Sequence, residues 1–289
     1  MSGKVYQQVE NAVLSVFAPG ASIVFDNRRW VVAEAAKPSA RSGGEGKTDI
    51  YVLLADANNQ HHELKISVKA STADWYENKM SQARFAQIFT TDERRRQLAA
   101  QAVAKTTALA ESGDIILSGD DYVVLGYKLD IIGAHATGHT NSFEIELTEG
   151  EAAEVISGSS LDAKKRNSSV NGDIVADSGA ASHLVHASAD FLSLSAPEQQ
   201  RFVFDNIVGI DDHVSVPENR RFRMKLSALS YGQRGSVREL SRKLFLTNRH
   251  IVQQGRIISW VDEDQDLFNR RAREVAQRLG ADVRAKILL

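Results

Sequence analysis

Residues 47–69 read KTDIYVLLADANNQHHELKISVK and contain two apolar runs separated by the polar turn ANNQ. The first run, from residue 49 to 56, predicts a strand, and so does the second, from residue 62 to 70. Side chains on a strand point alternately to its two faces, and strict alternation in the second run predicts one apolar and one polar face. The polar face consists of Glu63, Lys65, Ser67 and Lys69.

The flanking sequence extends this hairpin into a sheet with helices. Apolar residues at helical spacing predict a helix over residues 4–17, which Pro19-Gly20 ends, and residues 22–35 predict a strand before the hairpin. Two helices are expected at about 73–89 and 92–112, followed by a fourth strand, YVVLGYKLDII, over 122–132. The order helix, three strands, helix, strand predicts an α/β (α+β) fold in which the fourth strand joins a mixed sheet flanked by helices.

The second half of the chain carries weaker signals. Short strands are predicted at FEIELTE and SHLVHAS, a helix at PEQQRFVFDNIV and a strand at FRMKLSALS. Further helices are predicted at SVRELSRKLFLTNRHIV and over about 265–286. We therefore expect a core in residues 1–135 and an elaboration in residues 136–289 that packs on it, with one continuous domain as the alternative.

Composition narrows the class of protein. The 289 residues include no cysteine, which excludes disulfides and thiolate zinc sites. No apolar run approaches the roughly 18 residues of a membrane span, and the N-terminus lacks a signal-peptide pattern. We therefore expect no membrane association and a cytoplasmic protein.

Basic residues are concentrated in one segment although the net charge is −2. Residues 219–256 contain ten Lys or Arg and a single acid, Glu239. Such a block is typical of a surface that binds phosphates, and arginine and glutamine also suit base edges; a solvated arginine-rich helix is the alternative. The candidate DNA-binding residues are Arg220, Arg221, Arg223, Lys225, Gln233, Arg234, Arg238 and Arg242.

Acids and a lysine in the predicted hairpin suit phosphodiester hydrolysis. This reaction needs a hard divalent ion held by carboxylates and a cation that stabilises developing charge or orients water. Asp49 opens one strand, and Glu63 and Lys65 share a face of the next. We expect Asp49 and Glu63 to bind Mg²⁺ and Lys65 to assist the attacking water.

These residues resemble the PD-(D/E)xK nuclease superfamily, which includes most type II restriction endonucleases. The resemblance rests on Thr48-Asp49, on Glu63-Leu64-Lys65 and on the element order up to about residue 132. It implies a restriction-endonuclease-like catalytic core in residues 1–135, with catalytic roles for Asp49, Glu63 and Lys65, and a bacterial or phage origin. Residues 136–289 are then expected to recognise DNA and to carry a dimer contact. The family often has a further acid on its first helix, for which Glu10 is the candidate and Glu34 a weaker one. Thr48 stands where the name-giving proline would be.

The identity of the catalytic lysine stays open. Ser67-x-Lys69 lies on the same predicted face one pair further along the strand, and some family members displace catalytic residues. Lys65 is favoured over Lys69 by the motif. Lys47, in the glycine-rich loop before Asp49, is a candidate phosphate contact.

The sequence therefore predicts a Mg²⁺-dependent, site-specific endonuclease that cleaves double-stranded DNA. Cutting both strands of a palindrome is simplest for a two-fold symmetric enzyme, so a homodimer is expected. The alternatives are a structure-selective or repair nuclease, and a DNA-binding protein with an inactive nuclease-like core. A third interpretation treats the polar strand face as a solvated surface with cross-strand charge pairs.

Three other motifs match known functional patterns less well than the acids and lysine of the hairpin do. GGEGKT resembles a P-loop, but Arg41 stands where its first glycine would be, and a strand is predicted after it instead of a helix. His135 and His139 have the spacing of a helical metal pair but lie among glycines. Asp211-Asp212-His213 is expected to form a polar turn.

Overall fold

The computed structural model describes residues 3–40, 46–70, 75–78, 80, 82–112, 121–124, 127–136, 142–228, 250–253 and 256–260. The chain forms two compact units, each built from two segments. One unit combines Met1–Asp74 with Glu146–Arg221, and the other combines Trp75–Ile145 with Phe222–Leu289. The predicted core of residues 1–135 therefore does not coincide with either unit.

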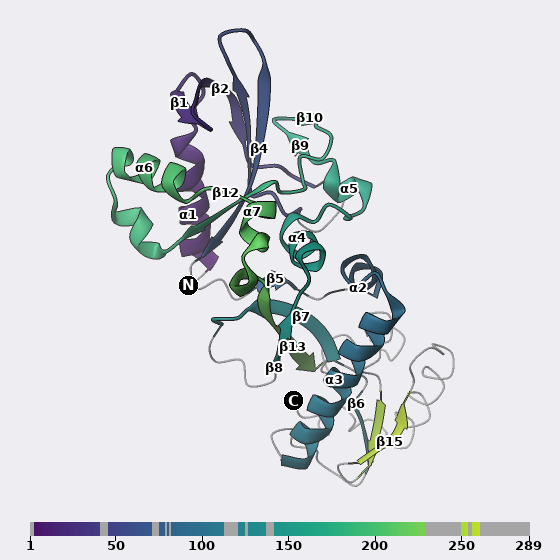
Figure 1. Cartoon of the computed structure of the whole chain (residues 1–289). Coiled ribbons are helices and arrows are strands. Elements are labelled where there is room, and N and C mark those ends of the chain that lie inside the picture. The colour runs from purple at the N-terminus through teal and green to yellow at the C-terminus, as the bar shows by residue number, and fades with distance from the viewer. Residues whose placement is uncertain are drawn as a thin grey trace. The chain divides into compact units, whose positions relative to one another are not determined.

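The first unit is built on a mixed sheet flanked by helices, which confirms the α/β class (Figure 1). Helix α1 (Gly3–Val16) precedes an antiparallel meander of β1 (Ser22–Phe25), β2 (Arg28–Ala36), β3 (Ile50–Ala55) and β4 (His61–Ala70). Strand β11 (His183–Ala187) joins parallel to β4, and β12 (Val208–Gly209) ends the sheet. The strand order is β1-β2-β3-β4-β11-β12. The predicted first helix and antiparallel meander are thus confirmed, except that residues 22–35, expected as one strand, form the two strands β1 and β2.

The predicted fourth strand of this sheet was wrong. Residues 122–132 fall into β6 (Asp121–Val124) and β7 (Tyr127–Gly133), which belong to two other sheets. The strand beside β4 is instead β11, which comes about 50 residues later along the chain than this segment. Leu184 and Val185 of β11 are both completely buried, one on each face, as expected of an interior strand. Both segments are apolar enough for a central strand, and local pattern does not identify a strand's partner.

Turn residues fix the register of the meander. Asp26 and Asn27, with φ of 50° and 58°, form the two-residue turn between β1 and β2, for which two positive φ values are required. Between β3 and β4, the Asp56 carboxylate accepts hydrogen bonds from the amides of Asn58 and Gln60, both at 2.8 Å. Asp56 also pairs with Arg28 at 3.0 Å, which connects the two turns.

Helices cover the apolar face of the sheet. Strand residues such as Leu64, Ile66 and Val68 are completely buried there. They pack against Val9 and Val13 of α1 and against the segment that contains η1 (Ala189–Ser193) and α6 (Ala196–Asn206). Figure 1 shows α1 and α6 side by side. This core fixes α1 against the sheet and therefore fixes every side chain that α1 presents at the edge.

A hairpin covers part of the polar face. Strands β9 (Ser169–Val170) and β10 (Asp173–Ile174) form it, and Val170 packs with Ala36 and Tyr51 in a small second apolar cluster. The Asn171 side chain donates a hydrogen bond of 2.7 Å to Glu34 of β2. The polar face is therefore a partly covered surface and not a bare solvated one.

The remaining helices of the first unit come from its second segment. They are α4 (Glu149–Ser157), α5 (Ala163–Arg166), α7 (Ile210–Ser215) and the short η2 (Pro217–Arg220). Thr148 caps α4 with a reciprocal Glu151 bond, and Gly158 ends it in the left-handed conformation. Helix α4 packs on α7. Along the chain, α4, α5 and the β9-β10 hairpin precede β11, whereas α7 and η2 follow it.

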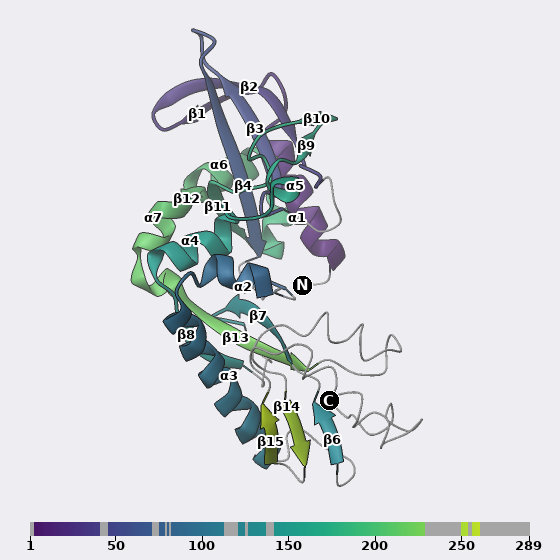
Figure 2. The same cartoon turned by 90° about the vertical axis from the view of Figure 1, so that its right-hand side faces the viewer.

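The second unit contains a four-stranded and a three-stranded sheet. The first has the order β5-β7-β13-β8, with β5 (Trp75–Glu77), β8 (Ser142–Glu146) and β13 (Arg221–Ala228). The second consists of β15 (Arg256–Trp260), β14 (His250–Gln253) and β6. Helices α2 (Gln82–Ile88) and α3 (Asp92–Ser112) also belong to this unit, seen from another side in Figure 2.

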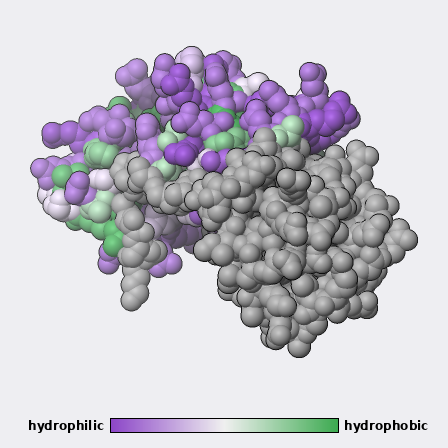
Figure 3. All heavy atoms as spheres, turned by 90° about the horizontal axis from the view of Figure 1, so that it is seen from below, coloured by the Kyte–Doolittle hydropathy of each residue, from purple (hydrophilic) through white to green (hydrophobic). Residues whose placement is uncertain are grey.

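Predictions for the second half are mostly confirmed where the structure describes them. Strands β8, β11 and β13 and helix α6 occur where the sequence predicted them. The helix predicted over 236–252 is wrong at its end, because His250–Gln253 pair with β6 and β15. The helix predicted over 265–286 lies outside the described residues. Among the described residues, no helix is long and apolar enough to cross a membrane, and Figure 3 shows mostly hydrophilic side chains on the coloured surface.

Candidate functional site

Asp49 lies immediately before β3 and is held against β4. Its amide donates to the Ile66 carbonyl at 2.9 Å. Its Oδ2 accepts hydrogen bonds from the Val68 amide at 2.7 Å and from the Ser67 hydroxyl at 3.4 Å. Because Ile50 pairs with Ile66, Asp49 lies opposite Ser67 on the polar face. The carboxylate is therefore fixed at the C-terminal end of β4, at the level of Ser67 and Lys69.

Glu10 and Lys69 act on Asp49 electrostatically. Burial is the main cause that raises the pKa of Asp49 above its ordinary value, and the negative charge of Glu10 raises it further. The positive charge of Lys69 opposes both effects. An acid whose ionised form is disfavoured by burial and by a second acid would be stabilised by a bound cation. Asp49, Glu10 and Lys69 thus form one electrostatic cluster.

Helix α1 brings Glu10 to this cluster. The Tyr6 hydroxyl donates to the Val68 carbonyl at 2.5 Å, and Glu10 lies one turn further along the same helix face. Lys37, just after β2, contacts Glu10 with a Nζ–Oε2 distance of 2.6 Å. Only 13% of the Glu10 side chain is exposed, so both acids of the cluster lie in partly desolvated positions.

Glu63 and Lys65 belong to a different group on the same face. Glu63 Oε1 accepts a hydrogen bond of 2.7 Å from the Tyr51 hydroxyl, and Lys65 Nζ lies 3.8 Å from Glu63 Oε2. Glu63 pairs with Leu53, which is four residues from Asp49, or about 14 Å at a rise of about 3.4 Å per residue. The structure therefore groups Asp49 with Glu10 and Lys69, and groups Glu63 with Lys65 and Tyr51.

The cluster offers few acidic ligands for an ion. Within the described part of the chain, no three His, Asp or Glu side chains lie close enough together to hold a metal. Asp49 Oδ1 and Glu10 Oε1 are not used in the contacts above, so two carboxylates have an oxygen to offer. Mg²⁺ is commonly held by one or two carboxylates, with waters and substrate phosphates completing its octahedron. The carboxylates of Asp49 and Glu10 would therefore suit Mg²⁺ if waters and a substrate phosphate supplied its other ligands.

Lys47 lies two residues before Asp49 against a loop of the second segment. Its amide donates to the Gly179 carbonyl at 2.7 Å, and its side chain passes close to Gly158 and Leu161. The residues that follow Lys47 continue into β3, a strand, which rules out the helix that a P-loop needs. Residues 41–45 of that glycine-rich loop lie outside the described residues.

The basic segment is only partly described. Arg220 pairs with Glu149 at 2.7 Å, and Lys225 Nζ lies 4.6 Å from the centroid of the Trp75 ring. Arg221 and Arg223 lie in β13, the former exposed and the latter half-buried. Gln233, Arg234, Arg238 and Arg242 lie outside the described residues. Arg220 and Lys225 thus make intramolecular contacts. Of the described members of the segment, Arg220 and Arg221 belong to the same unit as Asp49, whereas Arg223 and Lys225 belong to the other unit.

The described histidines of the two histidine motifs lie in a short helix and in a turn. Asp211, Asp212 and His213 lie in α7, a short helix, where a turn was expected. His213 contacts Asn219, and burial lowers the pKa of His213. His135 is exposed in a turn after β7, and His139 lies outside the described residues.

Sequence reasoning missed several residues around the cluster. Tyr6, Lys37 and Tyr51 each contact a candidate acid or its strand. The Gly179 carbonyl accepts hydrogen bonds from the two backbone amides that precede Asp49. The signal for Tyr6 was its spacing of four residues from Glu10 on a helix. Nothing local in residues 158–182 indicated that this loop packs beside residue 47.

Comparisons of the chain with protein-family models, with curated proteins and with solved structures found no match. The function is therefore inferred from the residues of the cluster and their geometry.

Proposed function

We propose that this protein is a Mg²⁺-dependent endonuclease that hydrolyses double-stranded DNA at specific sites. The observation that carries the proposal is the convergence of Asp49, Glu10 and Lys69 at one end of β4. A buried carboxylate, a second carboxylate on the first helix and a lysine on the neighbouring strand are the groups that metal-assisted phosphodiester hydrolysis requires. The resemblance of the sequence to PD-(D/E)xK nucleases supports the same reaction.

The topology of the first unit adds support. A helix, an antiparallel meander and a parallel strand beside the lysine-bearing strand follow in chain order, with residues 75–145 inserted before the parallel strand. This order is similar to the helix, three strands, helix, strand order of the resemblance, but the meander has four strands and β11 lies where residues 122–132 were expected. Because residues 75–145 are inserted, the strand beside β4 comes later in the chain than the sequence predicted.

Each residue of the cluster has a defined part in the proposal. Asp49 and Glu10 would hold Mg²⁺, which when bound supplies positive charge at the phosphoryl oxygens. Lys69 would orient the attacking water or stabilise charge that develops on the phosphate. Ser67, where the family pattern has an acid, holds Asp49 by its hydroxyl. Glu10 then supplies the second carboxylate that Ser67 lacks.

Glu63 and Lys65 form the second candidate pair. They keep the D/E-x-K spacing of the motif, and both side chains are partly exposed. In this version Lys65 would act on the water and Glu63 would join Asp49 on the ion. Contacts favour Lys69, because Glu63 is already bonded to Tyr51 and lies four residues along the strand from the level of Asp49.

Site specificity and a homodimer are part of the proposal. The second compact unit offers additional protein surface for recognition of bases. Two-fold symmetry would present two Asp49 clusters to the two strands of a palindrome.

Incubation with supercoiled plasmid and linear phage DNA, with Mg²⁺ or with EDTA, tests the proposal. Discrete Mg²⁺-dependent fragments that are absent with Asp49→Asn would establish a site-specific endonuclease. A smear would indicate a structure-selective or general nuclease. Retained binding without cleavage of any DNA would favour an inactive nuclease-like core. Equal cleavage by the wild type and Asp49→Asn would rule out the cluster as the active site.

A further inference from the structure

A basic turn, formed by Asp162–Arg166, lies beside the residues that lead into Asp49. The turn contains the helix α5, whose sequence is AKKR, and lies in the first unit. Gly179 connects the two segments: its amide donates to the Arg166 carbonyl at 2.8 Å, and its carbonyl accepts from the Lys47 amide at 2.7 Å and the Thr48 amide at 3.3 Å. Two hydrogen-bonded backbone steps, about 10 Å at the spacing of neighbouring strands, therefore separate the backbone of Arg166 from that of Lys47, which lies two residues before Asp49.

The backbone contacts around Gly179 leave no room for a side chain. A Cβ on Gly179 would lie 2.0 Å from the Lys165 carbonyl oxygen, and one on Gly46 would lie 2.7 Å from the Gly179 carbonyl oxygen. Three backbone segments therefore pack directly on one another. This packing fixes the position of the basic turn relative to the start of β3.

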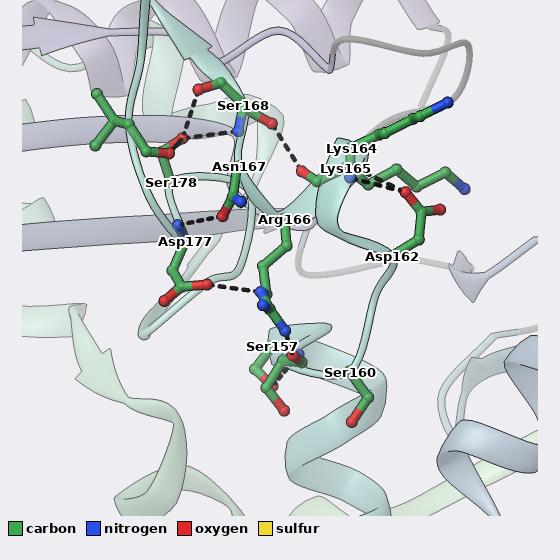
Figure 4. Close-up of polar contacts among 12 residues, drawn as sticks. Ser157, Ser160, Asp162, Lys164, Lys165, Arg166, Asn167, Ser168, Asp177 and Ser178 are labelled. Atoms are coloured by element: carbon green, nitrogen blue, oxygen red, sulfur yellow. Dashed lines mark hydrogen bonds and ion pairs between the residues drawn. The ribbon is translucent and has the colours of Figure 1, made fainter.

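The turn is rigid for reasons that do not involve its lysine side chains. The Asp162 carboxylate accepts hydrogen bonds from the backbone amides of Lys164 and Lys165, at 3.0 and 3.2 Å. Arg166 pairs with Asp177 at 2.7 Å, and the hydroxyls of Ser168 and Ser178 bond to backbone atoms around them. Figure 4 shows both lysine side chains extending away from this polar network.

The two lysines present positive charge. Lys164 is exposed and Lys165 half-buried, and within the part of the chain that the structure describes neither forms an ion pair. The nearest acids of the turn are already engaged, Asp162 by backbone amides and Asp177 by Arg166. Lys47 runs past Gly158 and Leu161, at the start of the same loop. Three cations thus lie along the path from the turn to Asp49.

We infer that Lys164 and Lys165, with Lys47, bind the DNA backbone in the neighbourhood of the scissile phosphate. This inference rests on the proposed function for its substrate. Through Gly179 the turn is held to the residues that lead into Asp49, and it is not part of the cluster itself. The turn would therefore contact phosphates other than the scissile one and fix the register of the strand without reading bases. Its rigidity lowers the entropy cost of that contact.

Salt dependence of DNA binding tests this surface. The full-length double variant Lys164→Gln/Lys165→Gln removes two charges but keeps the backbone amides that Asp162 caps. The matched control, Arg29→Gln/Arg201→Gln, removes two charges from exposed residues of β2 and α6 in the same unit. Fluorescence anisotropy with a labelled DNA duplex in EDTA, at several salt concentrations, gives the slope of log affinity against log salt.

The lysine variant is expected to lower the magnitude of that slope by about 2, since each phosphate contact contributes about 0.9, while the control leaves it unchanged. An unchanged slope in a folded lysine variant, or an equal loss in the control, would overturn the surface. A single Lys164→Gln variant, expected to lower the slope by about 1, serves if the double variant does not fold. Because EDTA prevents metal-dependent cleavage, the result is separate from the cleavage assay: altered binding with no nuclease activity would retain the surface and reject the proposed function.

Discussion

The Asp49 carboxylate accepts a 2.7 Å hydrogen bond from the amide of Val68, the residue between Ser67 and Lys69. This bond connects the start of β3 to the last residues of β4. It sets the acid at the level of Lys69 and away from Glu63, which is bonded to Tyr51. Of the two lysines on the polar face, Lys69 is therefore the one whose charge offsets the burial of Asp49.

Lys69→Ala is expected to lower the rate of DNA cleavage by about 10²- to 10³-fold, the usual loss when one group that stabilises developing charge is removed. Lys65→Ala is expected to change the rate much less, because Lys65 Nζ lies 3.8 Å from Glu63 Oε2, in the group that is separate from Asp49. Single-turnover cleavage of a plasmid measures both. The reverse order of effects would assign the reaction to Glu63 and Lys65.

The pKa of Asp49 predicts how its replacement affects stability. Burial and Glu10 raise this pKa above its ordinary value of 3.8, against the opposing charge of Lys69, so folding disfavours the ionised form of Asp49. The stabilisation from a raised pKa is complete below the unfolded-state value and disappears as pH rises through the folded-state value. Asp49→Asn, which remains neutral and still accepts from the Val68 amide, should therefore be more stable than the wild type at neutral pH. The difference should shrink as the pH falls toward the acid range.

Asp56→Asn provides the control of opposite sign. The amides of Gln60 and Asn58, together with Arg28, lower the pKa of Asp56. Its ionised form therefore stabilises the fold above the unfolded-state pKa, and this contribution disappears as pH falls through the folded-state value. Asp56→Asn should be less stable than the wild type at neutral pH and equal to it in strong acid. Thermal unfolding followed by circular dichroism across pH compares the two, and shifts of the same sign would contradict both assignments.

The sequence predicted what local pattern determines. Alternation from Glu63 to Lys69 predicted β4 and its polar face, and helical spacing around Val9 and Val13 predicted α1. Which strand pairs with β4 depends on long-range packing. The apolar patterns of β11 and of residues 122–132 do not distinguish the two segments, yet β11 is the one that pairs with β4. For the same reason, spacing alone favoured Lys65, whereas the register of β3 against β4 and the position of α1 bring Glu10 and Lys69 to Asp49.

Tyr51→Phe separates a structural role of Glu63 from a catalytic one. Tyr51 is 2% exposed, and its hydroxyl donates to Glu63 at 2.7 Å, while burial and this bond raise the pKa of the phenol well above its usual range. Loss of a hydrogen bond to a charged group costs about 1.5–3 kcal/mol, which urea unfolding should detect. DNA cleavage should remain close to the wild-type rate, and Glu63→Gln should behave similarly. Loss of cleavage in Glu63→Gln with normal stability would instead indicate an ion-binding role for Glu63.

Gly179→Ala should separate the backbone of the basic turn from the start of β3. The new methyl group would lie 2.0 Å from the Lys165 carbonyl oxygen and 2.7 Å from Ser168 Oγ, and backbone cannot yield as a flexible side chain can. Overpacking of this kind typically costs about 1–3 kcal/mol, and a clash with backbone belongs at the upper end or beyond.

Gly150→Ala is the matched control for this substitution. Gly150 lies in α4, and an alanine methyl group there would meet no atom within 4 Å, so this variant should stabilise the helix by up to about 1 kcal/mol. Urea denaturation compares both variants with the wild type. Because the same clash moves Lys164 and Lys165, folded Gly179→Ala protein should also bind DNA with a smaller salt slope, whereas Gly150→Ala should not. Equal stability of the two variants would mean that the three backbone segments do not pack as closely as the Gly179 contacts require.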